Sequence, residues 1–222
     1  MKYKIADIKN YIKLEHPSLI IQYLIVWIFT VSLFSIPIAV CDPFLPYIFN
    51  ILIAITVVID LFAVFIMFNV EKWQRLYILF VGVYSLSLSV VFYLSFFKIA
   101  YWVIGIKTPL LFIYTIIIYI LILLVGFMLH FKALSAGYYS NTKKKNFKSA
   151  GIIAGMSGTG ALIGRLLIRS ADNQTAMLIF AFVFLFLSYT MILGIHNIYK
   201  YYLIKKFEQY VDVYKLSKKK KS

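Results

Sequence analysis

The sequence predicts an all-α, polytopic integral membrane protein with six transmembrane helices and both termini in the cytoplasm. The chain has 222 residues, of which 63% are apolar, and its mean hydropathy is +0.89. A soluble domain of this length cannot bury so much apolar surface. Apolar runs of about 20 residues, the length that a spanning helix needs, follow one another almost without pause. Basic residues gather in the segments between these runs.

The basic residues also predict the orientation. Nineteen of the 23 Lys and Arg residues lie in the N-terminal arm, the second-to-third loop, the fourth-to-fifth loop and the tail. With six spans these four segments share one side, and the other side holds only Lys98, Lys107, Arg165 and Arg169. The positive-inside rule then places both termini in the cytoplasm. With five or seven spans the tail would lie on the opposite side of the membrane from the N-terminus. The basic residues would then no longer be concentrated on one side.

The predicted spans divide the chain into three parts. We expect a cytoplasmic arm at 1–17, a transmembrane domain at 18–197 and a cytoplasmic, basic, helical tail at 198–222. The first apolar run is too long for a signal-peptide core, so we interpret it as a retained span. Prolines mark the turn after the first span and the first turn of the fourth. The six spans are predicted at 18–40, 47–68, 76–97, 109–131, 149–168 and 175–197.

The fifth span is the most distinctive stretch, because it holds five of the ten glycines. Small residues spaced by four let helix backbones approach closely in a membrane. Small residues on two faces predict neighbours on two sides, so we place this helix in the interior of the bundle. A glycine-hinged or pore-lining helix is the functional alternative. One face carries Gly151, Gly155 and Gly158, and the opposite face carries Gly160, Gly164 and Ser157.

Four residues of this span, Gly155-Met156-Ser157-Gly158, resemble the Gly-x-Ser-Gly pattern around the nucleophile of rhomboid proteases. That family also has six spans and a histidine in a later span, which is the place of His196 here. No His-x-x-x-Asn pair accompanies the serine. Ser157 would also lie in the cytoplasmic half, whereas the family's site opens to the outside. An intramembrane serine protease is therefore a remote alternative, and no residue role is carried over.

Asp60 is the only acidic residue well inside a predicted span. An ionised carboxylate at the bilayer centre costs about 2.5–3.5 kcal/mol. Counting ~1.5 Å per residue, Asp60 lies about 20 Å deep, as do Ser157 and Ser188, with Thr30 within a turn. These four residues are the candidate intramembrane polar site: a proton or cation site, or a polar lock between helices. The alternative is that Asp60 is neutral or is satisfied by hydroxyls, while the Ser and Thr side chains bond to their own helices.

Neither a metal nor a cofactor is expected. Cys41 is the single cysteine, and no Cys/His cluster has metal-binding spacing. His130 and His196 fall near the cytoplasmic ends of their spans, where helix capping or interfacial hydrogen bonding is the expected role. No P-loop, zinc motif or dinucleotide-binding motif is present. An enzyme is therefore the least favoured class.

Several functions remain open. The favoured hypothesis is a protein that binds another membrane-active molecule, as in bacterial toxin or bacteriocin self-immunity or at a secretion locus. The alternative is transport, by a permease subunit pairing with an ATPase or by a carrier or channel that uses Asp60. We expect the bacterial plasma membrane, contacts of the Lys-rich tail with anionic lipid headgroups, and a membrane protein, a peptide or a second copy as partner. The net charge of +15 comes mainly from the basic segments that set the orientation in the membrane. It is therefore not taken as a sign of nucleic-acid binding, and no nucleic-acid partner is expected.

Overall fold

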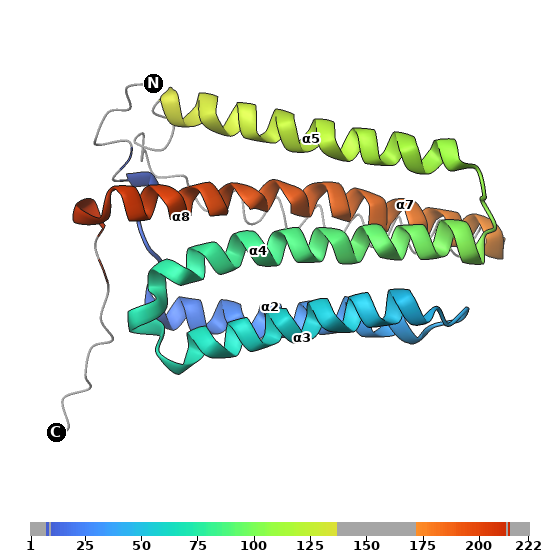
Figure 1. Ribbon diagram of the computed structural model, residues 1–222, viewed down its shortest axis with the longest axis horizontal. Coiled ribbons are helices and arrows are strands. Elements are labelled where there is room, and N and C mark those ends of the chain that lie inside the picture. The colour runs from blue at the N-terminus through green and yellow to red at the C-terminus, as the bar shows by residue number, and fades with distance from the viewer. Residues whose placement is uncertain (1–7, 9, 137–171, 212, 214–222) are drawn as a thin grey trace.

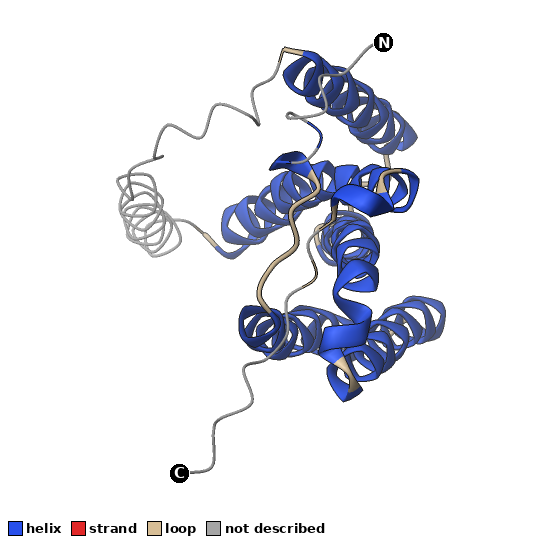
Figure 2. Ribbon diagram, turned by 90° about the vertical axis from the view of Figure 1, so that its left-hand side faces the viewer, coloured by secondary structure: helices blue, strands red, loops and turns tan. Residues whose placement is uncertain are grey.

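The computed structural model describes residue 8, residues 10–136, residues 172–211 and residue 213. Within these ranges all regular structure is helical, which confirms the predicted all-α class (Figure 2). Five helices are long and apolar enough to cross a membrane, as a multi-pass membrane protein requires. The predicted fifth span, with its five glycines and Ser157, lies outside the described residues.

The described helices follow one another with short connections. The long ones are α2 (Pro17–Val40), α3 (Pro46–Phe68), α4 (Val70–Phe97), α5 (Pro109–Ser135) and α7 (Asn173–Ile192). Short elements extend them: the π-helical turn η1 (Lys98–Val103), the 3₁₀ turn η2 (Leu193–Ile195), α8 (His196–Lys206) and the 3₁₀ turn η3 (Glu208–Tyr210). Proline stands in the first turn of α2, α3 and α5, where its missing N–H costs nothing.

Two boundaries differ from the sequence-based expectation. The third helix begins at Val70 and not near residue 76, because Asn69 caps it by accepting a hydrogen bond from the backbone N–H of Lys72 at 3.2 Å. The tail predicted as helical at 198–222 is α-helical only to Lys206 among its described residues, where α8 ends and the turn η3 follows.

The helices lie side by side along their length, with α4 in the middle (Figure 1). α2 and α3 lie on one side of α4, and α7 with α8 lies on the other, with α5 beyond it. Half of the most apolar stretch of α4 is buried, against 6% for α5. α4 is thus the structural centre of the described bundle, and α5 is its most peripheral helix.

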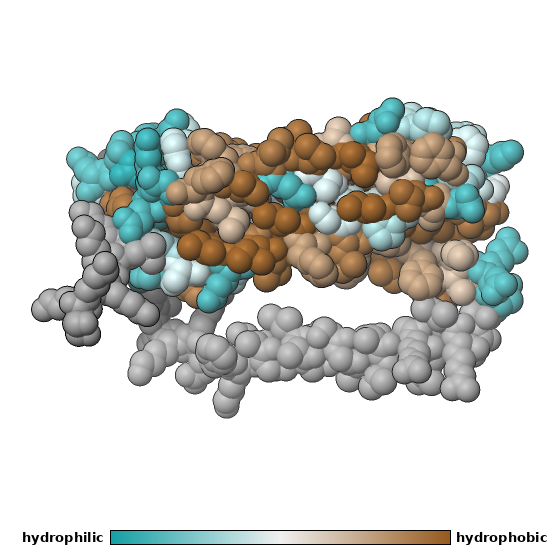
Figure 3. All heavy atoms as spheres, turned by 90° about the horizontal axis from the view of Figure 1, so that it is seen from below, coloured by the Kyte–Doolittle hydropathy of each residue, from teal (hydrophilic) through white to brown (hydrophobic). Residues whose placement is uncertain are grey.

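The middle of the bundle presents apolar side chains outward, and polar ones gather at the two ends (Figure 3). Large side chains such as Phe29, Leu61, Met128 and Phe186 are each at least 65% exposed. Burying one such side chain is worth about 1.5–3 kcal/mol. This distribution is unfavourable in water and favourable in lipid, so it supports a membrane-embedded bundle.

The antiparallel contact of α4 with α7 and its continuation is built from small residues. A Cβ atom added at Gly82 would come within 2.9 Å of the backbone N of Ile198, and one at Gly194 within 2.5 Å of the Cβ of Ser85. Ser89 and Ser188 are both fully buried at the same contact. Small residues let the two helix backbones approach closely, which is how helices gain packing energy in lipid.

The end of the N-terminal arm packs against the bundle. Ile8, Tyr11, Ile12 and Leu14 are all at most 6% exposed. Lys13 and Glu15, between and after them, are exposed. The segment thus combines the apolar anchors of a packed element with polar residues that face outward. It lies at the same end of the bundle as α8, because the Nζ of Lys200 donates a hydrogen bond to the carbonyl of Lys13 at 3.3 Å.

Candidate functional site

Asp60 lies in the middle of α3 and faces α2. The Oγ of Ser32 donates a hydrogen bond of 3.4 Å to its Oδ2. The other carboxyl oxygen, Oδ1, is buried and has no hydrogen-bond partner among the described residues. An unsatisfied carboxyl oxygen in a membrane span is costly. The group is therefore placed to hold a proton, or to accept a hydrogen bond from a species that enters the bundle.

Thr30 lies near Asp60 but bonds elsewhere. Its Oγ1 donates to the carbonyl of Val26 one turn earlier, at 2.7 Å. Tyr84 of α4 interacts with Thr30 and lies within electrostatic range of Asp60. The structure thus gathers Thr30, Ser32, Asp60 and Tyr84 at the α2–α3–α4 contact. Ser32 and Tyr84 are the members that sequence reasoning missed, and only the packing of α2 and α4 around α3 identifies them.

Ser188 belongs to a second polar cluster, between α4, α5 and α7. The Oγ of Ser89 donates to the carbonyl of Ser188 at 2.8 Å, and the Oγ of Ser188 donates to the carbonyl of Ser89 at 2.9 Å. The hydroxyl of Tyr119 lies 2.8 Å from the same Ser89 Oγ. Ser188 and Asp60 share no hydrogen bond within the described ranges. Ser157, the fourth candidate, lies outside these ranges.

The sequence carried a signal for this second cluster. Gly82, Ser85 and Ser89 recur at spacings of three and four, which puts small residues on one face of α4. The glycines of the predicted fifth span repeat the same small-residue pattern more densely.

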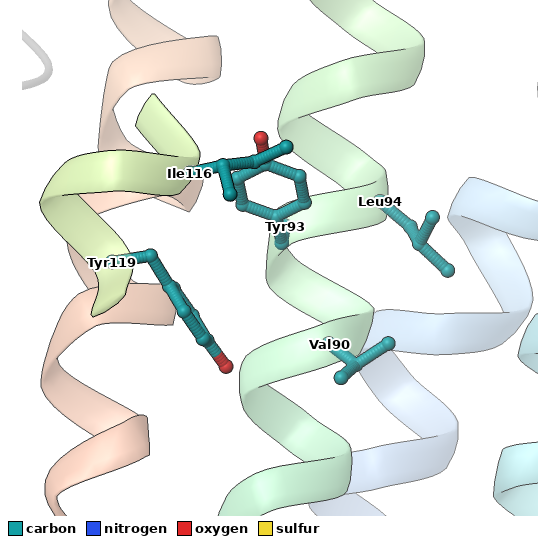
Figure 4. A pocket seen from close by; sticks show the side chains of 5 residues that line it. All are labelled: Val90, Tyr93, Leu94, Ile116 and Tyr119. Carbon is teal, nitrogen blue, oxygen red and sulfur yellow. The ribbon is translucent and has the colours of Figure 1, made fainter. Parts of the chain in front are cut away.

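Two tyrosines, Tyr93 and Tyr189, also attach α5 through hydrogen bonds with Thr115. The hydroxyl of Tyr93 lies 2.9 Å from the Oγ1 of Thr115, and the hydroxyl of Tyr189 donates to the carbonyl of Thr115, also at 2.9 Å. Beside these bonds, an apolar cavity of about 260 Å³ opens between α4 and α5. Figure 4 shows its lining from both helices: Val90, Tyr93, Leu94, Ile116 and Tyr119.

His130 and His196 come together although they are far apart in sequence. Their ring centroids are 4.9 Å apart. The hydroxyl of Tyr11 lies 2.9 Å from the Nε2 of His130, and the Nδ1 of His196 donates to the carbonyl of Leu193 at 2.7 Å. No group of three or more potential metal ligands occurs in the part of the chain that the structure describes. One nitrogen of each ring is used in these hydrogen bonds, the Nε2 of His130 with Tyr11 and the Nδ1 of His196 with Leu193.

Lys98, at the other end of the bundle, is fully buried. Its Nζ donates hydrogen bonds of 2.7 Å to the carbonyls of Ile38 and Cys41. These are carbonyls at the C-terminal end of α2, which carry the negative end of the helix dipole. The lysine that sequence analysis placed in an outer loop thus acts as a cap that joins α4 to α2.

Comparison of the chain with protein-family models, with curated proteins and with solved structures found no match.

Proposed function

We propose that this chain is a non-enzymatic, multi-pass membrane protein that acts by binding another membrane-resident molecule. The proposed partner is a membrane-active peptide or protein, as in toxin self-immunity or at a secretion locus of a bacterial plasma membrane. The observation that carries this proposal is the way α5 is held. Of its 27 residues only Thr115, His130 and Leu134 are buried, and an apolar cavity separates part of it from α4.

The contacts of α5 favour a binding role because they leave most of the helix uncovered. Its outer half is held by hydrogen bonds of Thr115 and Tyr119, and its inner end by the contacts of His130. Between these points its apolar side chains face outward. A helix with so few buried side chains offers an apolar partner both an exposed face and the adjoining cavity.

The remaining polar side chains support the same proposal. Ser35 of α2 and Thr56 of α3 bond to each other, and Ser89 bonds to Ser188. Hydroxyls that join helices in pairs stabilise a bundle by about 0.6 kcal/mol per contact. These hydroxyls hold the helices together. They therefore favour a rigid scaffold that binds a partner over a polar path through the membrane.

The proposed binding role is tested by filling the cavity. We compare Ile116→Trp, which places an indole in the α4–α5 cavity, with Phe29→Trp on the exposed face of α2. Cells producing each variant are challenged with a membrane-active peptide or protein against which the unaltered protein protects. We expect Ile116→Trp to lose protection and co-purification of that molecule in mild detergent, while Phe29→Trp keeps both. Equal behaviour of the two variants at equal membrane levels would refute the binding role of this cavity.

Transport is the second candidate, and one observation favours it. The buried Oδ1 of Asp60 has no hydrogen-bond partner in the described residues, and an ionisable residue inside a span is typical of proton and ion pathways. The transporter would be a carrier or channel, or a small permease subunit pairing with an ATPase.

Proteoliposomes with an imposed proton or cation gradient separate the two candidates. Under the transport hypothesis Asp60→Asn abolishes flux, and Asp172→Asn, at the exposed start of α7, preserves it. Flux that is absent in the unaltered protein, or equal in both variants, excludes this candidate.

Six spans with both termini inside remain part of the proposal. Supporting it, α5 ends beside α8, while α7 begins at the opposite end of the bundle (Figure 1). The chain between them connects the two ends, as a further span would. The Lys-rich end of the tail, proposed to meet anionic lipid headgroups, lies outside the described residues.

A further inference from the structure

We infer that the cavity between the N-terminal arm and α8 is a binding site for the headgroup of one anionic phospholipid. The cavity has a volume of about 460 Å³, within the range of small-molecule sites. It is the polar counterpart of the α4–α5 cavity and lies at the other end of the bundle. Its polar lining comprises Asn10, Lys13, Glu15, His196, Asn197 and Lys200.

The position of the cavity matches the headgroup layer. Lys13 and Glu15 lie just before Pro17, where the first spanning helix begins. Lys200 lies within the last two turns of the helical stretch that ends at Lys206. Tyr199 and Tyr202, whose rings are 6.0 Å apart, lie at the same level. Tyrosines of this kind are enriched where the bilayer meets water.

The charge of the lining favours an anion with a single net charge. Lys13 and Lys200 contribute two positive charges and Glu15 one negative charge, so the formal charge is +1 with His196 neutral. A phosphodiester with an uncharged polyol balances this charge. A zwitterionic headgroup leaves it unbalanced. Basic pockets between helices on the cytoplasmic side are a known form of lipid headgroup site.

The donors and acceptors of the lining match the two parts of such a headgroup. The Nζ of Lys200 makes one long bond, 3.3 Å, to the carbonyl of Lys13 and lies 5.7 Å from the ring centroid of Tyr11. It has further donors for phosphate oxygens. In neutral His196 the Nδ1–H is used by Leu193, so its Nε2 is an acceptor for a polyol hydroxyl, as is the carboxylate of Glu15.

The frame of the cavity is fixed before any lipid enters. Tyr11 bonds to His130 of α5, and Ile12 and Leu14 are buried in the bundle. The arm is thus anchored on both sides of Lys13, so binding does not require the arm to be ordered first. The inference holds whether or not α5 binds a partner.

The test measures lipid binding to the purified full chain in neutral detergent, by native mass spectrometry and by the shift in melting temperature. The probes are phosphatidylglycerol, phosphatidylcholine, and glycerol 3-phosphate or inorganic phosphate at the same concentration. We expect one phosphatidylglycerol to bind at least tenfold more tightly than phosphatidylcholine. We expect the soluble anions neither to stabilise the protein nor to displace the lipid. Displacement by inorganic phosphate would make this a free-anion site and overturn the lipid assignment.

Charge variants locate the binding. We expect Lys13→Gln with Lys200→Gln to weaken phosphatidylglycerol binding at least tenfold, and Glu15→Gln to strengthen it. The matched control is Lys205→Gln with Lys206→Gln, which removes two lysines of the same helix that lie over Tyr201 and Tyr202. Equal loss in both double variants, or weaker binding in Glu15→Gln, would refute the site. Melting temperatures in phosphatidylcholine show whether each variant is folded.

Discussion

At the scale of single residues, the bundle depends on places where only a particular side chain fits. Gly194 faces Ser85 so closely that an added Cβ would lie 2.2 Å from the Oγ of Ser85 and 2.5 Å from its Cβ. The Oγ can rotate away, but the Cβ is fixed to the backbone of α4. The absence of a side chain at Gly194 is therefore what sets the distance between α4 and η2.

We expect Gly194→Ala to destabilise the protein by about 1–3 kcal/mol, the usual cost of overpacking a close contact. Gly126→Ala is the control, because its added Cβ would meet only the movable Cδ2 of Leu193 at 2.7 Å. Unfolding in mixed detergent–SDS micelles measures both variants. Adding Ser85→Gly to Gly194→Ala relieves the clash and recovers part of the loss. No recovery would show that the contact does not limit packing.

Lys98 shows a second residue-scale dependence, since a fully buried ammonium is tolerated only with partners. We expect Lys98→Met to cost about 2 kcal/mol, because the carbonyls of Ile38 and Cys41 lose their charged donor. Lys107→Met, on the exposed connection before α5, is expected to be nearly neutral. The same unfolding assay measures both, and equal effects would argue against the capping role.

What the sequence predicted at this scale was residue type and depth, not partners. The depth of Asp60 and Ser188 followed from counting along apolar runs, yet their partners, Ser32 and Ser89, depend on how the helices rotate about their axes. Rotation is decided by contacts between helices distant in sequence. The contact of His130 with His196, which lie 66 positions apart, could not be predicted from the sequence for the same reason.

At the scale of elements, the helices differ in how firmly they are held. α4 has neighbours on both sides and carries the small-residue face, whereas α5 buries only three side chains and is attached through hydroxyl contacts and the rings of Phe112 and Phe131. The sequence predicted the existence of both helices well, because apolar length alone specifies a span. The sequence did not show which of the two helices is central. Their apolar runs are of similar length, and the helices differ only in how many of their side chains are buried.

This difference predicts that the backbone of α5 opens more readily than the backbone of α4. We expect amides of α5 to exchange hydrogen for deuterium faster than those of α4 when the protein is held in nanodiscs. Tyr119→Phe, which removes the bond to Ser89, is expected to speed exchange in α5 while leaving α3 unchanged. Tyr114→Phe, at an exposed position of the same helix, is the control. Equal protection of α4 and α5 would contradict the peripheral attachment of α5.

At the scale of the whole molecule, several described basic residues from segments distant in sequence lie together at one end of the bundle. Lys13 and Lys200 are in direct contact, and Arg75 at the start of α4 forms an ion pair with Glu208 beyond α8. The arm, the start of α4 and the end of α8 therefore meet at one end of the bundle. The charge pattern of the sequence predicted this grouping, because the positive-inside rule acts on whole loops and needs no knowledge of packing.

Thiol labelling in intact cells tests the orientation. In a Cys41→Ser background, we expect Lys13→Cys and Lys205→Cys to resist a membrane-impermeant maleimide until the cells are permeabilised. Lys107→Cys is expected to react at once. Labelling of Lys13→Cys from outside would reverse the proposed orientation, and opposite behaviour of Lys13→Cys and Lys205→Cys would refute an even number of spans.

The bond between Tyr11 and His130 has a consequence for biogenesis. The arm is synthesised before its partners on α5 and α8, which follow more than one hundred residues later. Until then the buried side chains of Ile8, Ile12 and Leu14 lack their final surroundings. The arm is thus synthesised well before its partners, and it can dock only after both α5 and α8 have been made.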